Sequence, residues 1–86
     1  MHLTTLERDV IKAIAENQYS DEPGDKIWSW AIEYHTKITL KKQIPGVVSS
    51  LVKKGLVISI DGWGKDDDTV QLTEDGVKVY NSIKES

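Results

Sequence analysis

Lysines are the residues whose types and spacing point most directly to chemistry in this chain. No aspartate or glutamate lies between Glu33 and Asp61. That segment carries Lys37, Lys41, Lys42, Lys53 and Lys54, with His35 beside them. Its formal charge is +5 and that of the remaining chain is −8, which together give the net −3. Clustered like charge can dominate the local field of an acidic molecule. The segment therefore predicts either a surface that binds phosphate groups or a solvated lysine-rich face.

The sequence offers few residues for a disulfide, a metal site or a catalytic site. The chain has no cysteine, which removes disulfides, cysteine zinc sites and thiol catalysis and suits a reducing compartment. His2 and His35 are far apart, and Asp61, Asp66 and Asp68 lack EF-hand spacing, so we expect no metal. There is no glycine-rich phosphate loop and no recognisable nucleophile with acid and base partners. We predict no enzyme activity and no cofactor.

Length and hydropathy predict one domain over residues 1–86. The apolar runs are too short to span a membrane, and Met1–Thr5 lacks the pattern of a secretion signal. We therefore expect a cytoplasmic protein without a membrane partner.

The first predicted element is a helix that begins at Thr4 and runs to about Gln18. Thr4 and Glu7 form a capping box, in which each side chain accepts a hydrogen bond from the backbone amide of the other residue. The helix is predicted from the spacing of residues on one face, which are Leu6, Val10, Ala13, Ile14 and Asn17.

A second helix is predicted over Lys26–His35, after a loop at residues 20–25 and with Asp25 as its cap. Its shared face would hold Ile27, Ala31 and Tyr34. Trp28 and Trp30 are two residues apart and cannot share a face, so one should be buried and the other partly exposed. An exposed tryptophan could belong to a partner surface, although an aromatic core is the preferred interpretation in a chain without phenylalanine.

The third predicted helix has the clearest apolar stripe, made by Ile44, Val47, Val48, Leu51 and Val52. Proline is tolerated only in the first turn of a helix, so Pro45 places the start near Lys42. Gly55 should end this helix in a left-handed conformation.

Two strands and a last helix follow. Leu56, Ile58 and Ile60 alternate with Val57 and Ser59 and predict a half-buried strand with Leu56, Ile58 and Ile60 on its buried side. Val70 and Leu72 predict a second strand. The glycine- and aspartate-rich residues 61–68 would form the tip of the resulting hairpin. Thr73 should cap a closing helix whose inward side chains are Val77, Tyr80 and Ile83.

Two segments carry a resemblance to a known family. Residues 51–57 read LVKKGLV, and residues 70–76 read VQLTEDG. In this order and at this separation they resemble winged helix-turn-helix transcription regulators of the MarR-like kind. The resemblance covers nearly the whole chain. It implies an α+β fold with a three-helix bundle, a β-hairpin wing and a C-terminal helix.

The resemblance also implies double-stranded DNA as the partner. The helix over about 42–54 would be the recognition helix in the major groove, and the wing over about 61–68 would lie near the backbone. A glutamine such as Gln43 can pair with adenine, and lysine with guanine or phosphate. Such modules commonly act as homodimers. The residues expected to face DNA are Thr36, Lys37, Lys41, Lys42, Gln43, Gly46, Ser49, Ser50, Lys53, Trp63 and Lys65.

Two alternatives stay open. The acidic remainder of the chain, the run Asp66–Asp68 and the tryptophans near residue 30 favour a winged-helix module that binds a protein partner and not DNA. Three adjacent carboxylates would be repelled by phosphates unless they point away, and a solvated loop tip is the preferred interpretation of these aspartates. An acidic surface that mimics DNA is a third interpretation, but it leaves the basic segment unexplained.

Overall fold

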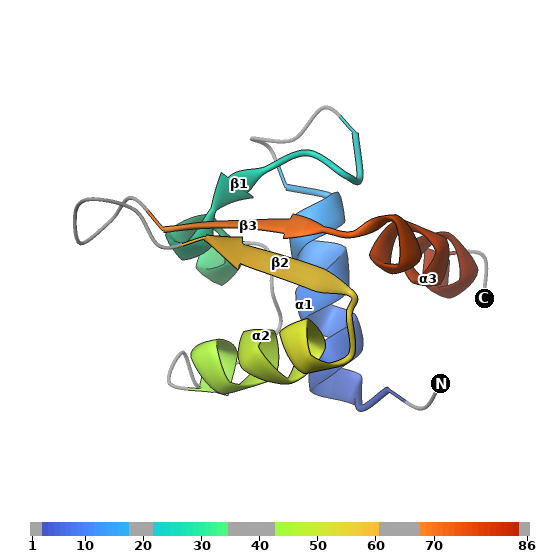
Figure 1. Cartoon of the computed structure of the whole chain (residues 1–86), viewed down its shortest axis with the longest axis horizontal. Helices are drawn as coiled ribbons and strands as arrows, with labels where there is room; N and C mark the ends of the chain where they lie inside the picture. The colour runs from blue at the N-terminus through green and yellow to red at the C-terminus, as the bar shows by residue number, and fades with distance from the viewer. Residues whose placement is uncertain (1–2, 18–21, 35–42, 61–67, 85–86) are drawn as a thin grey trace.

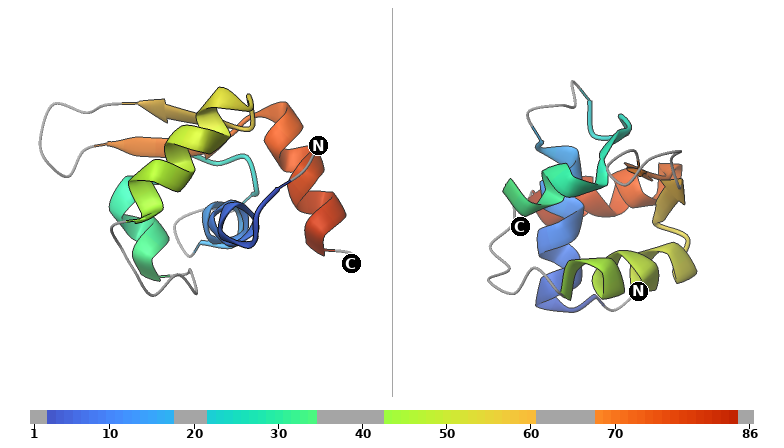
Figure 2. Two further views of the ribbon diagram at one scale, coloured as in Figure 1. Left: turned by 90° about the horizontal axis from the view of Figure 1, so that it is seen from below. Right: turned by 90° about the vertical axis from the view of Figure 1, so that its left-hand side faces the viewer.

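The computed structural model describes residues 3–17, 22–34, 43–60 and 68–84. These residues form α1 (Thr5–Ala15), β1 (Ile27–Trp28), the 3₁₀ helix η1 (Ser29–Tyr34), α2 (Gln43–Lys53), β2 (Val57–Ile60), β3 (Thr69–Leu72) and α3 (Glu74–Lys84). Helix α1 stands at the centre and the sheet crosses it (Figure 1). Viewed along α1, α2 lies on one side and α3 on the other (Figure 2). The other helices of the described residues, η1, α2 and α3, therefore pack around α1.

The core lies where α1 meets its neighbours, because α1 buries one continuous apolar face. The largest fully buried side chains of the core are Ile11, Ile14, Ile32, Leu51, Leu56, Val10 and Val70. The predicted capping box is confirmed: the Thr4 hydroxyl accepts from the Glu7 amide, and Glu7 accepts from the Thr4 amide. Helix α1 ends at Ala15, before the expected end near Gln18, which lies outside the described residues. Beyond it, the buried Asn17 side chain donates to the Ala31 carbonyl at 3.0 Å.

The prediction of a regular helix over Lys26–His35 is wrong. Ile27 and Trp28 form β1, which pairs antiparallel with Val70 and Thr69 of β3, and the helix begins only at Ser29 as a 3₁₀ helix. Asp25 therefore lies four residues before the start of this helix, and its carboxylate accepts from the Glu22 amide within the preceding turn. Local spacing suggested a helix, but pairing with a distant strand satisfies the same backbone groups.

Within the described part of the chain, the sheet has three strands in the order β1-β3-β2. The predicted hairpin is therefore confirmed, and β1 adds an edge strand to it. Val70 and Leu72 are buried as expected. The expectation for Ile58 and Ile60 is wrong, since their side chains are 45% and 44% exposed. Val57 pairs with Leu72 and points to the core with it, so the pleat turns Ile58 and Ile60 to the outer face.

Helix α2 begins within one residue of the predicted start, and Pro45 lies in its first turn. Gly55 ends it at φ 76°, in the left-handed conformation predicted for it. The Gly55 amide donates to Val52, and the Leu56 amide donates to Leu51. These two bonds make a Schellman motif, in which the buried Leu51 and Leu56 supply the apolar contact. Val52 departs from the predicted stripe, because its side chain is 41% exposed.

The closing helix starts as predicted. The Thr73 hydroxyl accepts from the Gly76 amide at 3.0 Å and donates to the Gly55 carbonyl at 2.7 Å, so one side chain caps α3 and ties it to the end of α2. Tyr80 is buried, and Val77 and Ile83 pack against the core. This order of helices around α1, with a small antiparallel sheet, is the winged-helix fold, which confirms the expected α+β class.

Gly76 should be irreplaceable where α3 passes the end of α2. A Cβ at this position would overlap the Leu56 carbonyl oxygen, which is backbone and cannot rotate away. We expect Gly76→Ala to lower the free energy of unfolding by at least about 2 kcal/mol, measured by urea denaturation. Gly46→Ala is the matched control, since nothing lies within 4 Å of its added Cβ and alanine favours a helix. It should leave stability unchanged or raise it by up to about 1 kcal/mol. Equal effects at the two sites would contradict this account.

Candidate nucleic-acid interface

One side of α2 is exposed and carries most of the predicted contact residues that the structure describes. The buried side of the helix holds Ile44, Val48 and Leu51. Residues on the opposite side recur three or four positions apart, as one helical face requires. Gln43, Gly46, Ser49 and Lys53 are all exposed and follow this spacing. The helix therefore offers one continuous solvent-facing surface.

This exposed face of α2 is small and polar. It bears one long cationic side chain (Lys53), an amide (Gln43) and a hydroxyl (Ser49), and α2 contains no acidic residue. Gly46 adds no side chain and has nothing within 4 Å of an added Cβ. A duplex could therefore approach the helix backbone closely at that position.

The rest of the predicted interface lies outside the described residues. Those positions are Thr36, Lys37, Lys41, Lys42, Trp63 and Lys65. They stay predictions. Of the wing tip assigned to residues 61–68, the structure describes Asp68 alone.

A buried carboxylate joins α1 to the second half of α2. Glu7 is only 4% exposed, although it is charged. Its two oxygens accept from the Lys54 ammonium at 2.8 and 2.7 Å, and Oε2 also accepts from the Ser50 hydroxyl at 3.0 Å. Oε1 accepts from the Thr4 amide at 2.9 Å. The cap of α1 and the end of α2 are therefore held by the same side chain.

The balance of these contacts sets the pKa of Glu7. Burial by itself raises the pKa, because it removes the charged form from water. The hydrogen bonds from Lys54, Thr4 and Ser50, with the Lys54 charge, outweigh burial and lower the pKa from 4.5 to about 2. Glu7 is thus a stable anion wherever the fold is intact at ordinary pH.

This contact divides the basic segment. The structure describes two of its five lysines, and they have different roles: Lys53 is exposed, whereas Lys54 is directed to Glu7. Ser50 is predicted to face DNA, but its hydroxyl donates a hydrogen bond to the same carboxylate. The exposed face of α2 therefore offers Lys53 as its cation.

Sequence reasoning missed this pairing, although a signal was present. Glu7 stands at a core position of α1, since Val10, Ile11 and Ile14 follow it at helical spacing. A buried charge needs a partner. The sequence could not say which of the many lysines that partner would be.

The described residues also bear on two other kinds of site. No group of three or more histidine, cysteine or acidic residues within ranges 3–17, 22–34, 43–60 and 68–84 could hold a metal ion. None of the described helices is long and apolar enough to cross a bilayer.

Several solved structures share this fold. BpsR of Bordetella bronchiseptica, whose structure concerns regulation of its DNA binding by 6-hydroxynicotinic acid, matches at a TM-score of 0.73 and 19% identity, over 96% of this chain and 53% of its own. RosR of H. salinarum matches at a TM-score of 0.70 and 20% identity, over 96% of this chain and 72% of its own. The PcaV transcriptional regulator of Streptomyces coelicolor was solved with its natural ligand. It matches at a TM-score of 0.68 and 21% identity, over 92% of this chain and 51% of its own.

These likenesses agree with the fold that the sequence motifs implied. The chain spans about half the length of BpsR and PcaV. No protein-family model and no curated protein matches it.

The Glu7 contact predicts a specific dependence of stability on pH. A carboxyl group whose pKa is lower in the folded state stabilises the fold above its unfolded value and loses that contribution as pH falls. The shift from 4.5 to about 2 corresponds to about 3 kcal/mol, lost between about pH 4.5 and 2. Glu7→Gln should therefore be about 3 kcal/mol less stable than the natural chain at pH 7, and the difference should vanish near pH 2.

Urea denaturation at a series of pH values would measure this difference. Glu22→Gln, which alters an exposed glutamate, is the matched control and should stay within about 0.5 kcal/mol of the natural chain. A difference for Glu7→Gln that does not change with pH would show that the carboxylate charge is not what stabilises the junction.

Proposed function

We propose that this chain is a DNA-binding transcription regulator that places α2 in the major groove of duplex DNA. The observation that carries the proposal is the exposed face of α2, which joins Gln43, Gly46, Ser49 and Lys53 on one side of a helix free of acidic residues. In winged-helix proteins this helix is the one that reads base edges. BpsR and PcaV, which share the fold, are named as a DNA-binding protein and a transcriptional regulator.

The proposed contacts divide by chemistry. Gln43 reads an adenine edge, while Lys53 and Ser49 contact phosphates. Thr36, Lys37, Lys41, Lys42, Trp63 and Lys65 complete the interface in this proposal, with Trp63 and Lys65 on the wing. The protein acts in the cytoplasm, as a homodimer on paired half-sites, and needs no cofactor or catalytic group.

A phosphate contact by Lys53 should appear in the salt dependence of binding. Each phosphate contact contributes about one counterion to the slope of log affinity against log salt. Lys53→Gln should weaken binding to random-sequence duplex DNA and reduce the magnitude of that slope by about 1. Fluorescence anisotropy at several salt concentrations would measure both.

Lys78→Gln is the matched control, because Lys78 is an exposed lysine of α3, away from α2. It should leave the slope unchanged.

The double substitution of Lys41 and Lys42 by Glu should abolish binding at moderate salt. Binding that ignores salt, or that responds equally to Lys53→Gln and Lys78→Gln, would refute the proposal.

Gln43 should set part of the sequence preference. A bidentate contact between glutamine and adenine discriminates against the wrong base by about 1–3 kcal/mol. Duplexes selected from a random pool by the natural chain should carry a fixed adenine that is lost when selection is repeated with Gln43→Ala. Ser82→Ala, on α3, is the control and should select the same sequences. If the fixed adenine is preserved in the pool selected with Gln43→Ala, a residue other than Gln43 recognises it.

The second candidate, a protein-interaction module, is favoured by the outer face of the sheet. Trp28 and Ile60 flank Thr69 across the three strands, and Ile58 lies on the same face. Their side chains are 40%, 44% and 45% exposed. Large apolar side chains gathered on an exposed face are typical of contact surfaces. If no DNA binding is measurable at low salt, this becomes the leading function.

A further inference from the structure

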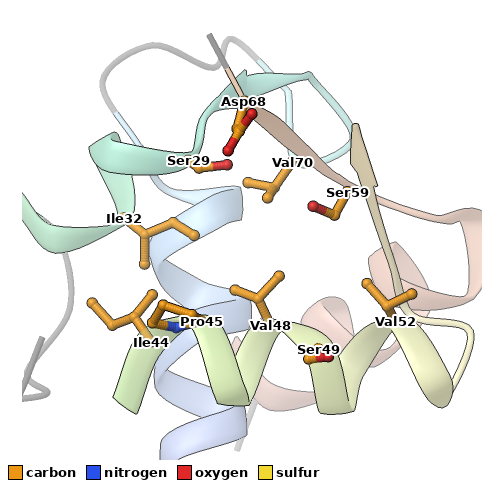
Figure 3. A pocket seen from close by; sticks show the side chains of 10 residues that line it. All are labelled: Ser29, Ile32, Ile44, Pro45, Val48, Ser49, Val52, Ser59, Asp68 and Val70. Carbon is orange, nitrogen blue, oxygen red and sulfur yellow. The ribbon is translucent and has the colours of Figure 1, made fainter. Parts of the chain in front are cut away.

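A groove runs between α2 and the sheet, bounded at one end by η1 (Figure 3). Its volume is about 460 Å³, within the range of about 300–1,000 Å³ typical of sites for small molecules. It lies on the side of α2 that faces the sheet, whereas Ser50 and Lys54 are directed to Glu7 of α1. Neither of the functions considered above uses it as a binding site.

Both walls of the groove are largely apolar. Along α2, Ile44, Val48 and Val52 recur four positions apart and point toward the sheet (Figure 3). Ile32 of η1 and Val70 of β3 lie across from them (Figure 3). A flat apolar body placed between these two walls would have branched side chains against both of its faces.

Two residues keep this hollow open. Ser59 pairs with Val70 and shares the inward side of β2 with Val57, but its small side chain fills less space than a core residue would. Val52 stays 41% exposed at the mouth of the groove and is not covered by the sheet. A ligand seated there would remove this apolar side chain from water, which favours binding.

The polar groups that remain available in the groove are serine hydroxyls. Ser29, Ser49 and Ser59 line it, and none of their hydroxyls has a hydrogen-bond partner among the described residues. Ser59 lies between Val70 and Val52, so its hydroxyl adjoins the apolar walls (Figure 3). A hydroxyl can donate and accept, and it therefore suits an uncharged polar group on the ligand.

The lining gives a charged ligand no partner of its own. No lysine, arginine or histidine is among the described residues that line the groove, so a ligand anion would meet no countercharge. Asp68 is the one acidic residue there, and it already interacts with another residue, so we assign it no part in binding. A charged group would therefore lose water without gaining an ion pair, which costs more than the same loss for an uncharged group.

We propose that this groove binds a small uncharged molecule with a flat apolar body and one hydroxyl group, as in an aromatic alcohol. The body lies among Val48, Val52 and Val70, and the ligand hydroxyl forms a hydrogen bond with that of Ser59. The proposal concerns the chain alone and does not depend on DNA binding, so either can fail without the other.

Three probes with the same indole ring distinguish this ligand class from charged ones. Tryptophol carries a hydroxyl, tryptamine an ammonium group and indole-3-acetate a carboxylate. Titration of the methyl-labelled chain with tryptophol should shift the methyl signals of Val48, Val52 and Val70, and not those of Ile58 and Ile60 on the outer face of the sheet. Tryptamine and indole-3-acetate should each bind at least about fivefold more weakly.

Three results of these titrations would overturn the proposal. They are the absence of tryptophol binding, equal or tighter binding of either charged probe, and shifts confined to Ile58, Ile60 or other residues outside the groove.

A first substitution tests the hydrogen bond. Ser59→Ala keeps the hollow and removes the hydroxyl, so it should weaken tryptophol binding about threefold to tenfold, as expected for loss of one uncharged hydrogen bond. Ser82→Ala, which alters an exposed serine of α3, is the matched control and should leave the affinity unchanged. Equal affinity of Ser59→Ala and the natural chain would remove Ser59 from the site.

A second substitution tests the shape of the groove. Val52→Phe should fill its mouth and abolish tryptophol binding, whereas Ile60→Phe, at a similarly exposed position on the outer face of the sheet, should not. Dispersed amide signals would verify that both variants are folded. Unchanged affinity in a folded Val52→Phe would refute the site.

Discussion

The position of α2 depends on one buried carboxylate. Glu7 completes the cap of α1 and receives the Lys54 ammonium and the Ser50 hydroxyl from the far end of α2. A buried charge is tolerated only when its lone pairs are occupied, and here three donor groups make four hydrogen bonds to the two oxygens. The contact fixes which side of α2 turns toward the core. It thereby fixes which side remains exposed.

A second constraint acts just beyond the same end of α2, where three segments meet through backbone atoms. Gly55 reverses the chain, the Leu56 carbonyl accepts from the Thr73 amide, and the Thr73 hydroxyl reaches back to Gly55 while capping α3. Gly76 lets α3 begin against this turn, since any side chain there would collide with Leu56. The wing strands therefore leave and return at a junction held by hydrogen bonds and not by side-chain packing alone.

These two constraints leave three unlike surfaces. The exposed face of α2 is small and polar, with Lys53 as its cation. The outer face of the sheet is apolar through Trp28, Ile58 and Ile60. Between α2 and the sheet lies a groove with apolar side chains along one wall and Asp68 along the other.

Local patterns in the sequence were enough for the elements whose signals are local. The capping box at Thr4, the start of α2 around Pro45, the left-handed Gly55 and the Thr73 cap each depend on residues within a few positions, and all were predicted correctly. Tertiary structure decided the rest. Ile27 and Trp28 became a strand only because β3 lies beside them, and the register with Leu72 turned Ile58 outward. The choice of Lys54 for Glu7, and the hollow above Val52, arise from segments far apart in the chain, whose meeting no short-range pattern encodes.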